Sequence, residues 1–381
     1  MSEVHPDDRP YAWAEVDAAT IEANAAYLAR IAAPAEVCAV VKAWGYGHGA
    51  AQSAEAALRG GATWLGVALV NEAAELRRRV DAPILVLTEP PLRQMVEVAE
   101  LGGVRPTVYT AEAIKAAISA VRQSGRADRL PVHLKVDTGM HRVGAAPEAA
   151  THLAQLIAES DELELEGFWT HLAVADEIDD AGYTASQLDT FERSLAALHE
   201  AGINPTLVHA ANSAGALFHP EARYDLVRCG IALYGIAPAP GLPGSEGLRP
   251  AMSLKARVSF VKKVQAGERI SYGLHHRFDR PSVVATVPIG YHDGVPRRLG
   301  LEGGEVLIGG RRRRIVGVVT MDQLMVDCGD DESVRPRDEV VLIGSQGDET
   351  ISSWEWAAKT DTIAYEIVCG ISVNRVPRRY S

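Results

Sequence analysis

The chain has 381 residues, enough for two domains with separate cores, and 47% of the residues are hydrophobic. Because it has 38 Lys and Arg against 50 Asp and Glu, its net charge of −12 disfavours nucleic acid or a membrane surface as a partner. No run reaches the roughly 18 apolar residues of a membrane span, and the N-terminal MSEVHPDDRP lacks an apolar signal core. The four cysteines are scattered without metal-ligand spacing, which favours reduced thiols, a cytoplasmic enzyme and no metal site.

Residues 11–16 alternate like a strand that can pair with either of the domains that follow. From about residue 36 to residue 230, short apolar runs alternate with stretches of helical period. The runs predict strands near 36–41, 63–68, 83–87, 104–108, 131–136, 163–169, 206–209 and 224–228. The helical stretches include 50–60, 71–79, 92–101, 111–123, 147–158 and 184–201. Eight such units favour an α/β fold, a (β/α)8 barrel over residues 1–240, and an open doubly wound sheet is the alternative.

The pattern changes at residues 237–244, a proline- and glycine-rich segment that indicates a linker. Residues 245–381 then contain short alternating runs and one helical stretch, 351–360, which predict a mostly antiparallel β domain. The runs lie near 253–265, 282–288, 304–308, 314–319, 323–328 and 339–343. The four consecutive arginines at 311–314 are interpreted as a solvated hairpin edge without a function.

Lys42 closes the first predicted barrel strand and is followed at once by the glycine-spaced turn Gly45-Tyr46-Gly47-His48-Gly49. A strand end holds a side chain rigidly, and the turn leaves the amine facing a cleft. Such a lysine is suited to form a Schiff base with a carbonyl compound, pyridoxal phosphate (PLP) among them. For an isolated lysine, a surface position at a strand end is the more common explanation.

Further polar residues follow the later strands, at the end where barrel enzymes carry their reactive groups. They are Lys135, Asp137, Arg142, His171, Asp176, His209, Asn212, Ser213, Arg228, Gly230 and Ile231. Strand alternation points Lys135 inward, where an ammonium must be paired, neutral or modified; an outward lysine in a register shifted by one is the alternative. Ser213 starts a short helical segment, and exposed backbone N–H groups at Gly230 and Ile231 complete a predicted phosphate site.

Nine segments in order resemble bacterial alanine racemases, from about residue 12 to residue 380. They are VVKAWGYGHG, HLKVDTGMHRVG, THLAVAD, HAANSAG, YDLVRCGIALYG, ISYG, IGYHDG, TMDQ and AYEIVCGISVNRVPR. The resemblance implies a PLP-dependent homodimer that interconverts L-alanine and D-alanine, with two active sites shared at the subunit interface. It also implies a supply of D-alanine for peptidoglycan, a specialised pathway being the alternative.

The resemblance implies a role for each matching residue. Lys42 of one subunit and Tyr272 of the other would be the two bases, one on each face of the substrate Cα, with His171 supporting Tyr272. Lys135 would be N-carboxylated and hold Arg142. Cofactor-binding residues would be Lys42, Tyr46, Arg142, His171, Asn212, Ser213, Arg228, Gly230, Ile231 and Tyr365. Substrate-binding residues would be Arg142, Met321 and Asp322, and the entrance would be lined by Tyr291, Arg297 and Asp176.

Arg228 is expected to face the pyridine nitrogen of PLP. A guanidinium keeps its proton at neutral pH, so that the nitrogen would stay unprotonated and the ring would be a weaker electron sink. This suits an enzyme that returns a proton to Cα without side reactions. It argues against a decarboxylase of the same architecture, which is the first alternative to a racemase. A non-catalytic PLP-binding protein is the second, although such proteins resemble the barrel alone.

Three positions depart from the family pattern. Trp44 stands where Asn or Asp is usual, Cys229 replaces a common proline, and Val318 replaces an arginine that helps to line the substrate entrance. Loss of that arginine predicts a wider or less charged entrance. We therefore expect a substrate range that extends beyond alanine, for example to serine.

Overall fold

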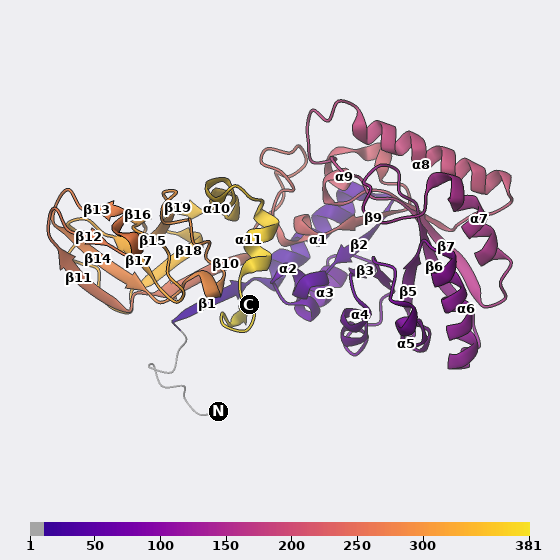
Figure 1. Cartoon of the computed structure of the whole chain (residues 1–381), viewed down its shortest axis with the longest axis horizontal. Coiled ribbons are helices and arrows are strands. Elements are labelled where there is room, and N and C mark those ends of the chain that lie inside the picture. The colour runs from indigo at the N-terminus through magenta and orange to yellow at the C-terminus, as the bar shows by residue number, and fades with distance from the viewer. Residues whose placement is uncertain (1–10) are drawn as a thin grey trace. The chain divides into compact units, whose positions relative to one another are not determined.

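The computed structural model describes residues 11–381 (Figure 1). The described chain divides into a barrel unit, residues 19–249, and a β unit that joins residues 250–381 to residues 11–18. Strand β1 (Ala12–Val16) belongs to the β unit, because it pairs antiparallel with β10 (Met252–Arg257) and parallel with β20 (Arg378–Tyr380). Backbone pairing therefore decides a question that the sequence pattern had left open.

Eight parallel strands of the described chain form the barrel in the spatial order β8-β7-β6-β5-β4-β3-β2-β9. They are β2 (Glu36–Val40), β3 (Trp64–Val67), β4 (Ile84–Val86), β5 (Val104–Val108), β6 (Leu130–Lys135), β7 (Leu163–Trp169), β8 (Leu207–His209) and β9 (Leu226–Cys229). Backbone hydrogen bonds of 3.0 Å from Asp225 to Val208 and from Arg228 to Ala211 join the β8 and β9 segments. The sheet is thus a nearly closed ring, which confirms the predicted barrel and excludes the doubly wound sheet.

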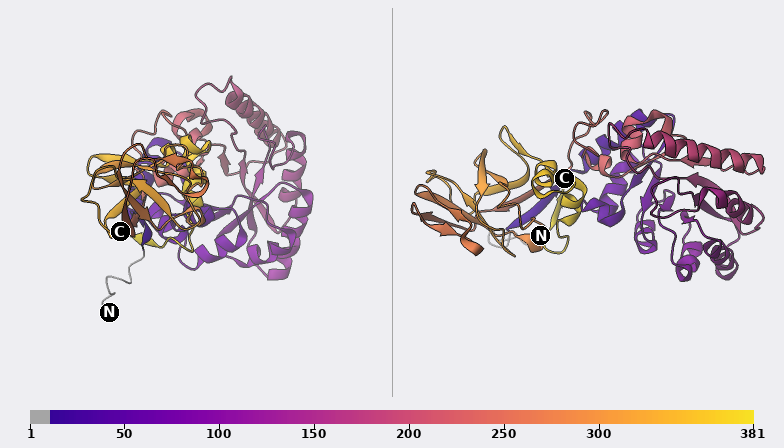
Figure 2. Two further views of the ribbon diagram at one scale, coloured as in Figure 1. Left: turned by 60° about the vertical axis from the view of Figure 1, so that its left-hand side comes forward. Right: turned by 45° about the horizontal axis from the view of Figure 1, so that its top comes forward.

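Helices α3 to α8 lie outside the strands of the barrel (Figures 1 and 2). The helices of this unit are α1 (Ala18–Ala32), α2 (Lys42–Tyr46), α3 (Ala50–Arg59), α4 (Val70–Arg77), α5 (Met95–Glu100), α6 (Ala111–Ser124), α7 (Pro147–Ala158), α8 (Tyr183–Glu200) and α9 (Ser213–Phe218). Helix α6 shows the local logic: the Thr110 side chain accepts the Ala113 N–H at 3.1 Å, and Gly125 ends the helix with φ 66°. Helix α1 was not predicted, although Ile21, Ala25 and Leu28 form its buried stripe.

The β unit contains a ten-stranded, mostly antiparallel sheet within the described residues. Its strands after β1 and β10 are β11 (Phe260–Val264), β14 (Ser282–Val287), β15 (Glu305–Ile308), β16 (Arg311–Ile315), β17 (Leu324–Asp327), β18 (Glu339–Gln346), β19 (Glu349–Ile351) and β20. Short strands β12 (Arg269–Ile270) and β13 (His276–Arg277) form a separate pair, and the helices are α10 (Ser353–Thr360) and α11 (Ala364–Gly370). The predicted β domain is confirmed.

Two details of the β unit differ from the sequence prediction. The predicted strand 314–319 is wrong, because β16 covers the arginine run itself, Arg311–Ile315. This run is also not a sheet edge, since β16 lies between β15 and β17. The positive charge is tolerated there because Arg312 forms ion pairs of 2.9–3.0 Å with three carboxylates, those of Glu305, Glu349 and Glu355.

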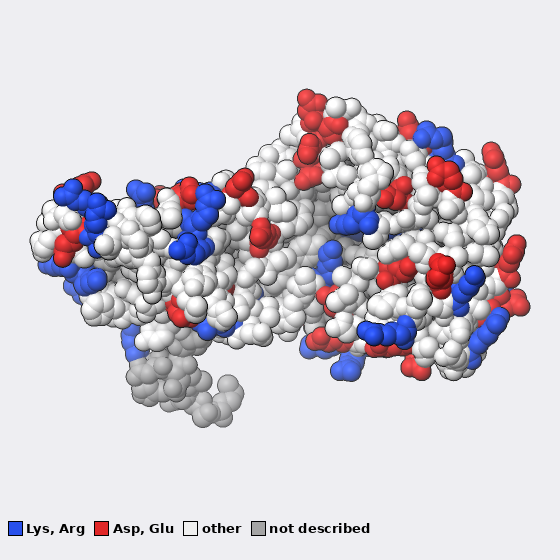
Figure 3. Space-filling view, viewed as in Figure 1, with Lys and Arg blue, Asp and Glu red and all other residues white. Residues whose placement is uncertain are grey.

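The described helices include none that is both long enough and apolar enough to cross a membrane. On the face drawn in Figure 3, basic and acidic side chains are interspersed.

Candidate active site

The segment that carries Lys42 has an unusual backbone. Lys42 directly follows β2, and the next four residues, Ala43 to Tyr46, all have left-handed angles with φ between 51° and 64°. Only glycine adopts this region at little cost, so Ala43, Trp44 and Tyr46 are held there by their surroundings. Trp44 keeps 40% of its surface exposed in this conformation. The lysine is therefore presented from a tight, strained turn and not from a mobile loop.

Glu72 of α4 anchors that turn. One carboxylate oxygen accepts the N–H of Ala43, the residue after Lys42, at 2.8 Å. The other accepts the N–H groups of Ala68 and Leu69 at 2.8 and 3.1 Å. Glu72 thus joins the turn after β2 to the turn after β3. Sequence reasoning missed this residue, because nothing in the local pattern around α4 shows which distant backbone its carboxylate will meet.

Lys135 at the end of β6 is 3% exposed, so it faces inward as the strand alternation predicts. Its Nζ lies 4.7 Å from the ring centroid of Trp169. Burial lowers the pKa of Lys135 to about 7, helped by the positive charges of Arg228, Arg142 and Lys42 and opposed by Asp137. The barrel end therefore gathers four basic side chains, and the pKa of one of them, Lys135, lies near neutral pH.

Arg228 in β9 is 3% exposed and is held by several acceptors. Its Nη2 donates to the backbone oxygens of Thr170 and Ala210 at 2.8 and 2.9 Å, and it lies 3.3 Å from Nδ1 of His171. Burial lowers the pKa of Arg228 to about 10, so that it stays charged at neutral pH. Because a guanidinium only donates, Nδ1 of His171 must accept, and the proton of this imidazole must sit on Nε2.

His171 is neutral for two reasons. Burial holds its pKa well below the ordinary range, and the positive charges of Arg228, Lys135, Arg142 and Lys42 act in the same direction. The electrostatic coupling of these four cations to one imidazole shows that the structure brings Lys42, Lys135, Arg142, His171 and Arg228 together. The group carries excess positive charge, which suits anionic ligands such as phosphates and carboxylates.

The predicted phosphate-binding residues also meet at this end of the barrel. The Asn212 side chain caps α9 by accepting a backbone N–H at 3.0 Å, and Ser213 Oγ accepts the N–H of Gly230 at 2.9 Å. Contrary to the prediction of exposed amides, Gly230 and Ile231 are buried, because this turn packs beneath Tyr46 and Ser213. A Cβ on Gly230 would lie 2.5 Å from the Tyr46 hydroxyl, so only glycine permits this approach.

The loops that carry Arg142 and His171 are braced by a residue that sequence reasoning missed. Gln187 of α8 is 1% exposed, and its amide oxygen accepts the N–H of Ala173 at 2.8 Å. Its nitrogen donates to the carbonyl of His171 at 3.1 Å and to Oγ1 of Thr138, in the loop that carries Arg142, at 3.3 Å. Arg142 itself is exposed, and Asp176, predicted at the entrance, is half-buried in the loop after β7.

The remaining predicted residues form a second group in the β unit. Tyr272 is 73% exposed and lines a cavity of about 560 Å³ together with Tyr291, Arg297, Met321 and Asp322. These five residues come from four separate segments, and all were predicted as site residues. Tyr365 is half-buried in α11, whose Glu366 and Ile367 line a neighbouring cavity that also includes Tyr291 and Arg297.

Close backbone approach shapes the wall of the Tyr272 cavity. A Cβ on Gly290 would lie 2.3 Å from the carbonyl oxygens of both Thr320 and Met321. Tyr291 donates its N–H to Thr320 at 3.0 Å. Val318 is only 2% exposed, and its carbonyl accepts the Ser271 hydroxyl at 2.8 Å. Val318, which was expected at the entrance, thus lies beneath the cavity wall, because the loop directs the Val318 side chain into the core.

Arg375 is a further residue that sequence reasoning did not single out. Its guanidinium lies 2.7 Å from Asp322 and 2.7 Å from Asp293, which is 6% exposed and also accepts the N–H of Gly290 at 2.8 Å. The arginine therefore ties the C-terminal segment to both loops that form the cavity. Arg375 lies in the segment AYEIVCGISVNRVPR, which resembles the family, so the segment marked it as a candidate. Its two partners, Asp322 and Asp293, are 53 and 82 residues away in the sequence and could not be inferred from it.

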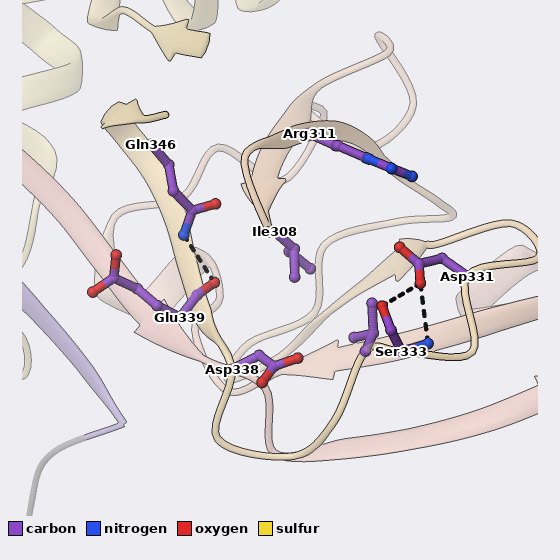
Figure 4. A pocket seen from close by; sticks show the side chains of 9 residues that line it. Ile308, Arg311, Asp331, Ser333, Asp338, Glu339 and Gln346 are labelled. Atoms are coloured by element: carbon purple, nitrogen blue, oxygen red, sulfur yellow. Dashed lines mark hydrogen bonds between the residues drawn. The ribbon is translucent and has the colours of Figure 1, made fainter. Parts of the chain in front are cut away.

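A third hollow, of about 400 Å³, lies near the turn between β15 and β16 (Figure 4). Its carboxylates serve their own loops: Asp331 accepts from Ser333, and Asp338 accepts the N–H of Arg335 at 2.8 Å. Across residues 11–381, no group of His, Cys, Asp and Glu side chains has the arrangement of a metal site. None of the residues that line this hollow is among the predicted site residues.

Comparison with known proteins identifies relatives for both units. The family description "Alanine racemase, N-terminal domain" matches residues 16–238, and "Alanine racemase, C-terminal domain" matches residues 251–380. An alanine racemase of Symbiobacterium thermophilum is 50% identical over 369 residues, which cover 97% of this chain and 96% of the relative. The crystal structure of alanine racemase from D-cycloserine-producing Streptomyces lavendulae matches with a TM-score of 0.92 at 38% identity, over 98% and 97% of the two chains. A histidine racemase from Leuconostoc mesenteroides subsp. sake matches with a TM-score of 0.87 at 30% identity, over 99% of both chains.

Proposed function

The chain belongs to the alanine racemase family and racemises alanine, and we propose that it does so with PLP and two bases, Lys42 and Tyr272. The observation that carries this proposal is the gathering of Lys42, Lys135, Arg142, Arg228 and neutral His171 at one end of the barrel. A surface lysine at a strand end would not have such neighbours. The comparisons with known proteins support the assignment but do not assign roles to these residues.

The residues of the barrel end fit PLP. The cofactor brings a phosphate dianion, for which the hydroxyls of Tyr46 and Ser213 and the Gly230 turn are suitable partners beside a cluster of positive charge. Lys42 would hold the cofactor covalently, and Arg228 would face its ring nitrogen. Tyr365 would add a contact to the phosphate, with Asn212 and Ile231 shaping the turn. When bound, PLP withdraws electrons from the substrate Cα.

Racemisation requires a proton to be removed from one face of Cα and returned to the other. We assign Lys42 to the face of the D-enantiomer and Tyr272 of the partner subunit to the face of the L-enantiomer. His171 keeps its proton on Nε2, which leaves an N–H available to stabilise a tyrosinate oxygen. Because Tyr272 is 73% exposed, a partner surface is needed to give it a dry environment, which supports a homodimer with shared sites.

The substrate carboxylate would be held by Arg142 of one subunit and by the backbone near Met321 of the partner subunit and Asp322 of the partner subunit. Tyr291, Arg297 and Asp176 would line the approach. Lys135 is suited to carboxylation, because a buried amine with a pKa of about 7 is in part the neutral, nucleophilic form at neutral pH. Attack of Nζ on the carbon of CO2 forms an N–C bond and releases one proton. The resulting anion would pair with Arg142.

Two aspects of the function extend beyond the family assignment. A wider substrate range, including serine, is a second candidate, favoured by the histidine racemase that has the same fold. A cytoplasmic location is supported by the buried free thiols of Cys38, Cys229 and Cys328, since free thiols persist in reducing compartments.

The test is racemisation of L-alanine and L-serine by the purified protein, with a scan for the visible absorption band of bound PLP. Fast turnover of alanine together with the band, both lost in Lys42→Ala, is the expected result. The band without turnover of either amino acid would contradict the racemase and leave a PLP-binding protein. Alanine preferred over serine by several orders of magnitude would contradict the wider range.

A further inference from the structure

The interior of the barrel contains a continuous chain of polar side chains, where branched apolar residues normally fill the layers of such a barrel. Five residues from five strands take part. Arg228 Nη1 lies 2.8 Å from Nδ1 of His209, and Nε2 of His209 lies 2.9 Å from Nδ1 of His133. Nε2 of His133 lies 3.1 Å from Oε2 of Glu166, which also accepts from Arg105 at 3.0 Å. We call this set, Arg228–His209–His133–Glu166–Arg105, the barrel relay.

The two ends of the barrel relay differ in their surroundings. Arg228 is 3% exposed and lies among the residues of the candidate site. The side chains of Glu166 and Arg105 are 15% and 21% exposed. Arg105 is the second residue of β5, toward the amino end of its strand, whereas Arg228 is the third residue of the four-residue strand β9. The relay thus reaches from the reactive end of the barrel toward its other end.

The donors and acceptors of the barrel relay can be assigned in only one way when both histidines are neutral. The guanidinium of Arg228 only donates, so Nδ1 of His209 accepts and its Nε2 carries the proton. That proton is donated to Nδ1 of His133, which leaves the proton of His133 on Nε2, directed at the Glu166 carboxylate. The hydrogen bonds from Arg228 through the two histidines therefore all run toward Glu166, which accepts from Arg105 on its other side.

The electrostatics agree with this assignment. Burial lowers the pKa of His209 and of His133, and the nearby charge of Arg228 acts in the same direction. Burial alone would raise the pKa of Glu166, but the hydrogen bonds from His133 and Arg105 outweigh it and lower the pKa. Two neutral imidazoles thus lie between a guanidinium and a carboxylate.

The backbone of β7 is shaped to admit the barrel relay. The pairing of β6 with β7 passes from Val132 opposite Leu165 to His133 opposite Gly167, so Glu166 is an extra residue at a β-bulge. A Cβ on Gly167 would lie 2.3 Å from Nδ1 of His133. The bulge re-aims Glu166 toward the relay, and the glycine leaves room for the imidazole ring.

We propose that Glu166 is a positioning residue for racemisation, because it holds His133 in one tautomer and His133 in turn supports His209 and Arg228 in the orientation that the cofactor site needs. This inference rests on the proposed role of Arg228 beside PLP. Without the carboxylate, His133 is free to take the other tautomer, which would turn its Nδ1–H against the Nε2–H of His209. His209 would then shift, and Arg228 would lose the support of its Nδ1 acceptor.

The direct test reads the tautomers without any turnover. Protein labelled with ¹⁵N in its 12 histidines, prepared both with and without PLP, is examined by NMR, in which protonated and unprotonated ring nitrogens have separate shifts. Spectra of His133→Asn and His209→Asn assign the signals. We expect Nδ1 to be unprotonated in both imidazoles of the wild type, and Glu166→Leu to mix the tautomers of His133. An unchanged pattern in Glu166→Leu would overturn the proposal.

Activity provides the second readout. Glu166→Leu is expected to lower kcat roughly 10- to 100-fold in both directions with little change in KM, and to shift the absorption band of bound PLP. Glu166→Gln keeps an acceptor oxygen and should recover most of the activity. Glu164→Gln, the same change at an exposed position of β7, is the matched control and should have no effect. Gly167→Ala displaces the His133 ring without removing a polar group and should resemble Glu166→Leu.

The outcomes separate the two proposals. If the variants lose thermal stability and PLP occupancy but keep the wild-type band and kcat per bound cofactor, Glu166 is structural only and the inference fails. If wild-type protein shows the expected tautomers and no racemase activity, the proposed function fails while the relay stands.

Discussion

The two groups of candidate residues differ in how they obtain their chemistry. In the barrel unit, Lys135 and Arg228 are each 3% exposed, and burial together with neighbouring charges shifts their pKa values. In the β unit, Tyr272 and Met321 are 73% and 52% exposed on the rim of a cavity. The barrel group is therefore pre-organised by its own fold, whereas the β group depends on whatever surface covers it. Substitutions in the two units should therefore have different effects on cofactor binding, turnover and stability.

Removing the two proposed bases should show the largest difference between the barrel group and the β group of candidate residues. Lys42→Ala should abolish racemisation in both directions and remove the absorption band of bound PLP, because this lysine would hold the cofactor. Tyr272→Phe should lower turnover by about 10²- to 10⁴-fold, the usual effect of losing a general base or acid, and keep the band. Coupled assays in both directions and a visible spectrum measure both effects. Loss of the PLP band in Tyr272→Phe would contradict the assignment of cofactor binding to the barrel group alone.

Truncating a buried cation should cost far more stability than truncating an exposed one. Arg228→Leu leaves the carbonyls of Thr170 and Ala210 and an imidazole nitrogen of His209 without their donor, which we expect to cost about 3–5 kcal/mol. Arg311→Leu, at an exposed position of the β unit, should change stability by less than about 0.5 kcal/mol. Urea unfolding of both variants checks this. Equal losses of stability would show that burial in the barrel does not make Arg228 more important for stability than an exposed arginine.

The neutral histidines of the barrel make its stability depend on pH. His133, His171 and His209 have lowered pKa values when folded, chiefly because of burial, so only the unfolded chain takes up these protons as the pH falls below about 6.5. Stability is therefore lost as the pH falls, by at most about 1.4 kcal/mol per histidine at pH 5.5. Unfolding curves from pH 7.5 to 5.5 measure the slope. His209→Asn should flatten it, and the matched change at exposed His152 should not.

A smaller effect tests the cavity wall of the β unit. Gly290→Ala places a Cβ against two carbonyl oxygens at 2.3 Å, so the loops that carry Tyr291 and Met321 must separate. We expect a loss of about 1–3 kcal/mol and a raised KM for alanine, with the PLP band unchanged. Gly102→Ala is the control, because its Cβ would meet nothing within 4 Å. An unaltered KM would show that the cavity does not contact substrate.

The sequence prediction was accurate where a feature depends on neighbouring residues and inaccurate where it depends on residues far apart in the chain. The barrel strands were predicted to within about two residues, because each is a short apolar run between helical stretches. The orientation of Lys135 followed from alternation within a single strand. Helix α1 was missed and the strand at 314–319 was wrong. The arginine run of β16 is stabilised by Glu349 and Glu355, which lie outside its own hairpin, so its local composition was misleading.

The sequence by itself determined the family, the barrel and the residue types at the ends of its strands, because these are written in local periodicity and short motifs. Only the tertiary structure decided which groups meet: Glu72 under the turn of Lys42, Gln187 between two loops, Arg375 across two carboxylates, and the histidines between Arg228 and Glu166. These contacts join residues about 14 to 80 positions apart. Their hydrogen bonds and pKa shifts arise from burial, which a local pattern does not specify.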